Sequence, residues 1–128
     1  MIGEYTAAML PPAMGPTVAH WRAVSDAVQK FTAQGRWSCC APEARTLPDF
    51  ELRWDDPAMA THAAAETAYF AGGRIVVALR SNLPPERVHE HMLHELMHVR
   101  DAALYRGGCP IPILEERAHR MAERLARW

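Results

Sequence analysis

The amino-acid sequence predicts a single α+β domain, with helices toward both ends and a small, mainly antiparallel sheet between them. Apolar residues recur every three or four positions over residues 18–31 and again over 114–125, which is the period of a helix. Between them, residues 49–55 alternate between polar and apolar, as in a half-buried strand. The 128 residues suffice for one hydrophobic core and are too few for two.

The N-terminal part of the chain combines a proline-rich start with one helix. Residues 1–16 hold three prolines and two glycines without a clear period, so we expect an extended arm there. Thr17 is suited to cap the helix that follows, which we expect to end near Gly35. The apolar residues at helical spacing are Val18, Trp21, Val24, Val28 and Phe31.

Three stretches in the middle of the chain predict the strands. After a loop over 37–48, the alternating residues 49–55 form the first strand, which Pro57 ends. The alanines of the run 64–71 would also suit a helix, but residues 67–70 are rich in strand-forming side chains and Gly72-Gly73 suits a tight hairpin, so we favour a strand. That third strand, over 74–80, is apolar throughout its centre, so we expect it to be covered on both faces.

Two helices complete the prediction. Ser81 and Asn82 offer capping groups ahead of two prolines that suit a first helical turn. This helix should run to about Tyr105 and stop at Gly107-Gly108. A last helix begins near Ile113 and continues toward the C-terminus. Its buried stripe is Leu114, Ala118, Met121 and Leu125.

Composition narrows the possible partners and compartment. The formal net charge is −1, from 14 basic and 15 acidic residues without a basic block, so we expect no nucleic-acid partner. The first residues have no basic flank before an apolar run, which predicts neither a signal peptide nor a membrane span and favours the cytoplasm. Cys39, Cys40 and Cys109 are an odd set without C-x-x-C spacing, so we expect free thiols.

One motif carries the chemistry. Residues 94–98 read His-Glu-Leu-Met-His, an H-E-x-x-H pattern within the predicted helix. A helix places residues four apart on the same face, so His94 and His98 can bind one metal ion while Glu95 stands beside a bound water. The pattern predicts a zinc ion and a hydrolytic reaction.

A catalytic zinc ion needs a third protein ligand. Asp101 shares the face of the histidines but lies about 10 Å beyond His94 along the axis, which suits a partner that orients an imidazole. His91 has the same geometric difficulty on the other side. Cys109 could bind only through an unusual loop placement.

The last helix offers two further carboxylates. With Leu114 set to zero, the buried stripe ends at about 80°, Glu115 lies at about 100°, and Glu116 points away at about 200°. Glu115 is therefore the favoured third ligand. An exposed first-turn carboxylate facing the helix dipole is the alternative interpretation of this residue.

These residues resemble the zincin metallopeptidases, and among them the gluzincins, in which a Glu on a following helix completes H-E-x-x-H. Residues 115–122 are similar to the compact ImmA/IrrE-type pattern, E-x-x-x-N, with His119 in place of the usual Asn or Asp. The resemblance implies a zincin-like fold and a ligand role for Glu115. It also implies that substrate binds as an added strand along a sheet edge, for which 74–80 is the candidate, with an interior core strand as the alternative.

The sequence thus predicts a zinc metallopeptidase acting on a peptide or protein. We expect Zn²⁺ to be held by His94, His98 and Glu115, with Glu95 as the general base. Tyr105 or His119 could stabilise the oxyanion, although a surface histidine is an equal interpretation of His119.

Two alternatives stay open at this point. The first is a non-catalytic interaction module stabilised by zinc, which a fourth ligand such as Cys109 or His91 would favour. The second is an α+β interaction domain without a metal ion.

Overall fold

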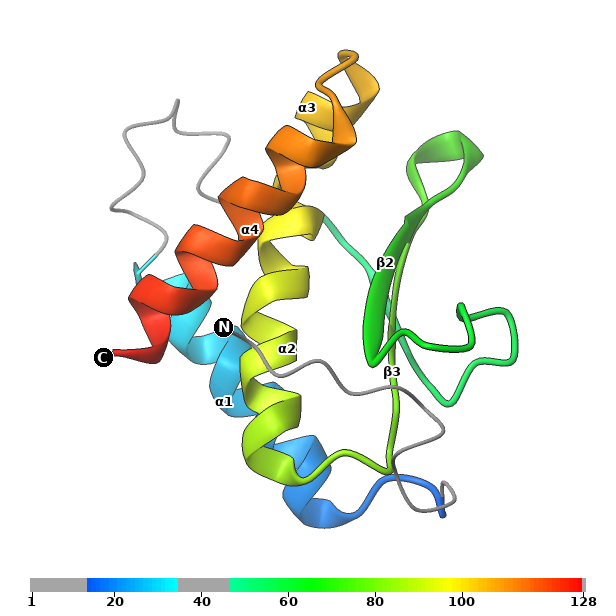
Figure 1. Ribbon diagram of the computed structural model, residues 1–128, viewed down its shortest axis with the longest axis vertical. Coiled ribbons are helices and arrows are strands. Elements are labelled where there is room, and N and C mark those ends of the chain that lie inside the picture. Colours follow the sequence, from blue (N-terminus) through cyan, green and yellow to red (C-terminus); the bar gives the residue numbers. More distant parts are fainter. Residues whose placement is uncertain (1–13, 35–46, 128) are drawn as a thin grey trace.

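The computed structural model describes residues 14–34 and 47–127, which form an α+β fold of four α-helices and three strands (Figure 1). Most of the predicted arm over 1–16, and Cys39 and Cys40, lie outside these residues. The elements run in the order α1 (Val18–Gln34), β1 (Glu51–Trp54), β2 (Ala65–Tyr69), β3 (Ile75–Leu79), α2 (Pro85–Arg100), α3 (Ala102–Arg106) and α4 (Ile111–Ala126).

The first helix begins as predicted. The Thr17 hydroxyl accepts a hydrogen bond of 3.4 Å from the backbone N–H of His20, and Nδ1 of His20 accepts one of 3.0 Å from the backbone N–H of Thr17. Because Nδ1 is an acceptor, Nε2 carries the proton and donates to the carbonyl oxygen of Leu83, 2.7 Å away. This buried histidine therefore ties the start of α1 to the segment that precedes α2.

The three strands form a mixed sheet in the order β1-β3-β2. β3 pairs in parallel with β1 and antiparallel with β2, so the predicted mainly antiparallel sheet is corrected to one pair of each kind. The predicted use of 74–80 as a substrate-binding edge is wrong, because β3 is the central strand. All five of its residues are buried, as a strand that is apolar on both faces requires. The hairpin from β2 to β3 is confirmed, and it turns through a short 3₁₀ segment with Gly72 at φ 75°.

Ser81, one of the two residues predicted to cap α2, has another role. Asp55 follows β1 in the left-handed region at φ 54°, and its carboxylate accepts bonds from the backbone N–H and the hydroxyl of Ser81 at 2.9 and 2.6 Å. Ser81 therefore fastens the end of β3 to the end of β1. The N-cap residue of α2 is Pro84, which makes no side-chain cap.

The predicted long helix through Tyr105 is broken. α2 ends at Arg100, Asp101 has a non-helical ψ of 11°, and the separate short helix α3 follows. α4 begins at Ile111, earlier than predicted, because a helix tolerates Pro112 in its first turn, where the missing N–H would have no partner in the helix.

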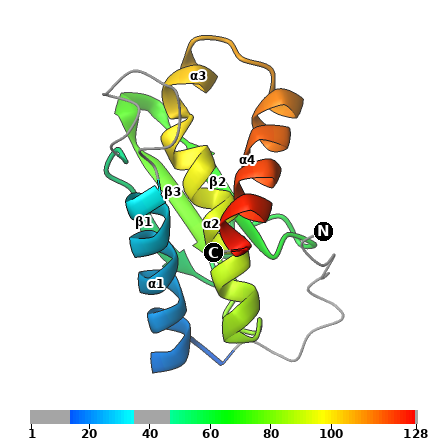
Figure 2. The same cartoon turned by 90° about the vertical axis from the view of Figure 1, so that its left-hand side faces the viewer.

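Helix α2, which carries the H-E-x-x-H pattern, lies at the centre of the fold. It packs against α1 and α4 and against β2 and β3 of the sheet, as two views of the ribbon show (Figures 1 and 2). Side chains from α1, β3, α2 and α4 form one hydrophobic core, in which Phe31, Val77 and Leu96 are almost fully buried. Within the described ranges, every helix is too short or too polar to cross a bilayer.

Candidate metal centre

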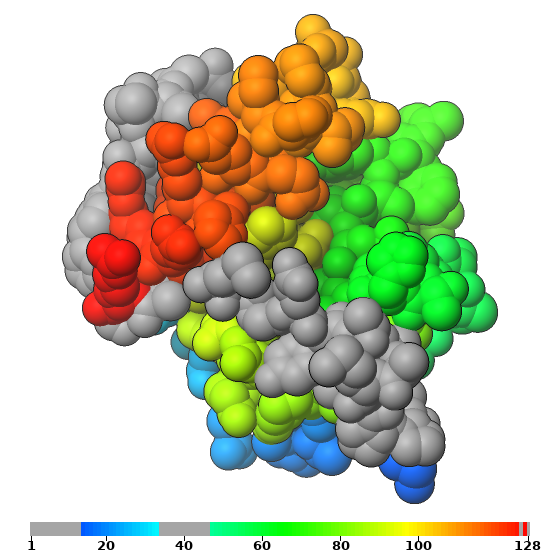
Figure 3. All heavy atoms as spheres, viewed as in Figure 1, coloured from blue at the N-terminus to red at the C-terminus, as the bar shows by residue number. Residues whose placement is uncertain are grey.

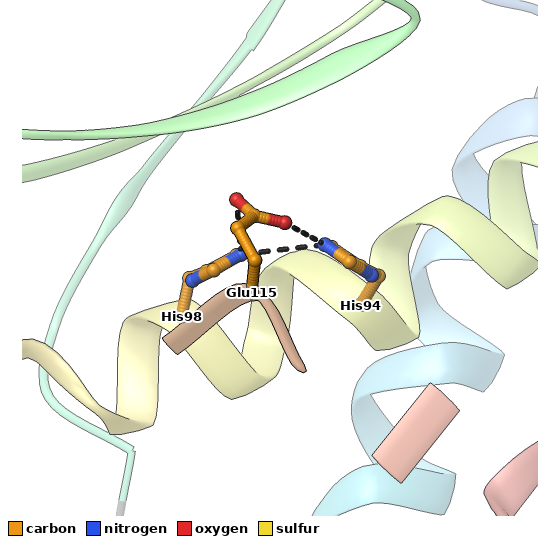
Figure 4. Close-up of side chains that lie close together, drawn as sticks. All are labelled: His94, His98 and Glu115. Atoms are coloured by element: carbon orange, nitrogen blue, oxygen red, sulfur yellow. Dashed lines mark hydrogen bonds and ion pairs between the residues drawn. The ribbon is translucent and has the colours of Figure 1, made fainter. Parts of the chain in front are cut away.

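Two elements bring three potential ligands together. His94 and His98 lie one turn apart on α2, and Glu115 lies in the first turns of α4. Nε2 of His94 is 3.1 Å from Glu115 Oε2, Nε2 of His98 is 3.1 Å from Glu115 Oε1, and the two Nε2 atoms are 3.3 Å apart. The three side chains point toward one another (Figure 4). Within the described ranges, the donor atoms of these three side chains lie close enough together to hold one metal ion.

The local sequence explains why Glu115 faces α2. Leu114 and Ala118 are buried beside it, so the apolar stripe of α4 turns this edge of the helix toward the centre of the fold. Glu116, one residue on, keeps 63% of its side chain exposed and pairs with Arg120 on the same helix. The helical phase computed from the sequence therefore agrees with the placement of both carboxylates.

Protons cannot satisfy all three contacts of this group at once. A proton on each Nε2 would serve the carboxylate but would set two N–H groups against each other across 3.3 Å. Hydrogen bonds from His94 and then His98 hold the pKa of Glu115 well below its usual value. Burial alone would lower the pKa of His98, but the bond to Glu115 and the surrounding carboxylates together raise it. A single cation would meet the lone pairs of all three groups.

The group lies in a cavity of about 290 Å³ between α2, α4 and β2. Figure 3 shows the hollow between α4 (orange) and β2 (green), with atoms of α2 at its base. Glu95 lines the same cavity, is only 5% exposed, and has its pKa raised by burial. The complete lining is Ala65, Glu66, Thr67, Tyr69, His94, Glu95, His98, Ile111, Leu114 and Glu115.

The two residues predicted to stabilise an oxyanion lie elsewhere. Tyr105 stacks on Tyr69 with ring centroids 4.4 Å apart and is 39% exposed, and it is not among the lining residues. His119 pairs with Glu123, one turn further along α4, at 3.0 Å. The described structure brings neither ring into the cavity.

The other candidate ligands also stand apart from the group. Asp101 is 3% exposed and accepts two hydrogen bonds from the Arg117 guanidinium, at 2.8 and 3.1 Å, instead of orienting an imidazole. It therefore links the end of α2 to α4. His91 and Cys109 are described but do not belong to the group of side chains that could hold a metal ion.

Sequence reasoning missed the contribution of β2. Thr67 donates a hydrogen bond of 2.9 Å to Glu95 Oε1, and the hydroxyl of Tyr69 donates one of 2.6 Å to the carbonyl oxygen of His98. Burial, followed by nearby negative charges, raises the pKa of Tyr69 to about 12, so this hydroxyl stays a donor. The sequence did offer a signal for this contribution. Side chains alternate between the two faces of a strand, so residues 65, 67 and 69 share one face.

Comparisons of the chain with known protein families, with curated proteins and with solved structures find no match. A function for this chain therefore has to be inferred from its own residues.

Proposed function

We propose that this chain is a zinc-dependent metallopeptidase. The observation that carries the proposal is the convergence of His94, His98 and Glu115 at a cavity that Glu95 also lines. Two imidazoles and a carboxylate are a donor set used by zinc hydrolases, and a carboxylate beside them can serve as a general base. This matches the resemblance to gluzincins noted in the sequence.

The distances within the group support zinc as the ion. In a tetrahedral site with bonds of about 2.0–2.1 Å, neighbouring donor atoms lie about 3.3–3.4 Å apart. Here the two Nε2 atoms are 3.3 Å apart, and each lies 3.1 Å from one oxygen of Glu115, His94 from Oε2 and His98 from Oε1. A zinc ion would therefore need only small movements of these side chains.

The number of protein ligands favours catalysis over a purely structural zinc site. Structural sites are closed by four protein ligands, whereas catalytic sites use three and leave one position for water or substrate. The group has three members among the described residues, and it borders a cavity instead of being enclosed. These features support a hydrolase more strongly than a zinc-stabilised interaction module.

The roles of the residues follow from their placement. When bound, zinc acts as a Lewis acid and lowers the pKa of a coordinated water toward about 7. Glu95, buried at the cavity wall, would accept the proton of the attacking water and deliver it to the leaving amine. This role would also account for the presence of a carboxylate at a position where an uncharged residue would cost less to bury.

The free edge of β2 supports a peptide as the substrate. β2 pairs with β3 on one side, and no described strand pairs with its other side. Four of its residues line the cavity. An extended peptide can therefore add to β2 as a further strand, with its backbone passing the metal group. This assigns to β2 the role that the sequence had suggested for the following strand.

The test combines metal analysis with peptide cleavage. Purified protein should retain about one zinc ion per chain and should cleave members of a random peptide library. The Glu95→Gln variant should keep the zinc ion and lose at least about a hundredfold in rate. A zinc-loaded wild type that cleaves no peptide, or a Glu95→Gln variant with the wild-type rate, would reject the proposal.

A further inference from the structure

A hydroxyl group on β2 holds the candidate general base. Thr67 Oγ1 lies 2.9 Å from Glu95 Oε1, to which it donates a hydrogen bond, and 3.5 Å from the backbone carbonyl oxygen of Glu95. We infer that Thr67 is a positioning residue, which fixes the Glu95 carboxylate in the orientation needed for proton transfer within the cavity. This inference rests on the proposed function.

Burial makes a donor to Glu95 necessary. The residue is 5% exposed, and a carboxylate removed from water is costly unless hydrogen bonds replace those it has lost. The bond from Thr67 serves one oxygen, Oε1. The other oxygen is then available to a water molecule in the cavity, which is the arrangement that a base requires.

The register of β2 selects Thr67 for this contact. Residues 65, 67 and 69 share one face of the strand, and Ala65 has no side-chain donor. The hydroxyl of Tyr69 is already engaged by the carbonyl oxygen of His98. Thr67 itself is held in place because it lies opposite Val77 of the buried central strand. The donor thus projects from a rigid part of the fold.

The contact matters because a glutamate carboxylate is otherwise free to rotate. The last torsion of Glu has a broad, two-fold energy profile, so its oxygens are not fixed by the chain alone. Removing a hydrogen-bond partner that orients a group at a metal site typically costs ten- to hundredfold in activity.

The kinetic arm of the test uses two substitutions of Thr67, one that removes the hydroxyl group and one that keeps it. In the zinc-loaded enzyme, Thr67→Val removes the hydroxyl with almost no change in volume and should lower kcat by about ten- to hundredfold. KM and the zinc dissociation constant should stay within about twofold, and Thr67→Ser should restore most of kcat. The exposed Thr61 provides the matched control, because Thr61→Val should behave as the wild type. A wild-type kcat for Thr67→Val would overturn the inference. So would an equal loss of kcat in Thr67→Ser and Thr67→Val.

The second arm does not depend on catalysis or on metal. A double-mutant cycle of Thr67→Val and Glu95→Ala, measured by urea unfolding of the metal-free protein, should show coupling of about tenfold or more in the unfolding equilibrium constant. Additive effects of the two substitutions would overturn the inference. Because this arm needs no turnover, it stays informative if the wild type cleaves no peptide, which would reject the proposed function alone.

Discussion

The ion pair between the buried Asp101 and the partly exposed Arg117 should be costly to break from the arginine side. Replacing Arg117 with Met keeps an unbranched apolar stem and a similar helix propensity but leaves Asp101, which is 3% exposed, without its two hydrogen bonds. Removing one partner of a fully buried pair costs about 3–5 kcal/mol. The Arg117 side chain is 36% exposed, so water can partly replace it, and we expect a loss of about 2–3 kcal/mol.

Urea unfolding of the metal-free protein measures this loss. With a slope of about 2 kcal/mol per molar, the midpoint of Arg117→Met should fall by about 1–1.5 M. Arg120→Met is the matched control on the same helix, because Arg120 and Glu116 keep 76% and 63% of their side chains exposed. That control should change stability by no more than about 0.5 kcal/mol. Equal midpoints for the two variants would refute the role assigned to the Asp101–Arg117 pair.

Two further predictions concern ligand choice and pH. Glu115→Ala should weaken zinc binding at least about a hundredfold in a competition titration, whereas Glu116→Ala should leave it within about twofold; equal losses would contradict the helical-phase argument. Burial lowers the pKa of His91 from its ordinary value near 6.5 to about 4. Below pH 6.5 His91 is protonated in the unfolded chain but stays neutral in the folded protein. The wild type should therefore lose stability as the pH falls from 6.5 to 4. The His91→Gln variant should lose less stability over this pH range. If the urea midpoints of the wild type and the variant fall by the same amount, the burial of a neutral His91 imidazole is contradicted.

Local patterns in the sequence were enough to predict several parts of this fold. The helical spacing of α1 and its cap at Thr17, the hairpin before β3, and the orientation of α4 all depend on neighbouring residues. The placement of Glu115 belongs to the same class, because the phase of a helix follows from its apolar stripe. Its role as a zinc ligand stays a prediction.

The features that the sequence did not predict depend on contacts between distant segments. β1 pairs in parallel with β3, although β2 is the next strand along the chain. No local pattern in the sequence determines whether β2 or β3 pairs with β1. The break of the helix at Asp101 accompanies a carboxylate held by Arg117, 16 residues away. The bond from Thr67 to Glu95 spans 28 residues. Each depends on how two elements that are distant in the sequence are placed relative to one another, which tertiary packing decides.

The central claim is that His94, His98 and Glu115 hold one zinc ion with a position open to water. Zinc-edge X-ray absorption of the purified protein tests this most directly. The spectrum should show only nitrogen and oxygen neighbours at about 2.0–2.1 Å, with the outer-shell scattering of two imidazoles. A sulfur neighbour at about 2.3 Å, or a third imidazole that closes the site, would contradict the account, as would protein that fails to bind zinc.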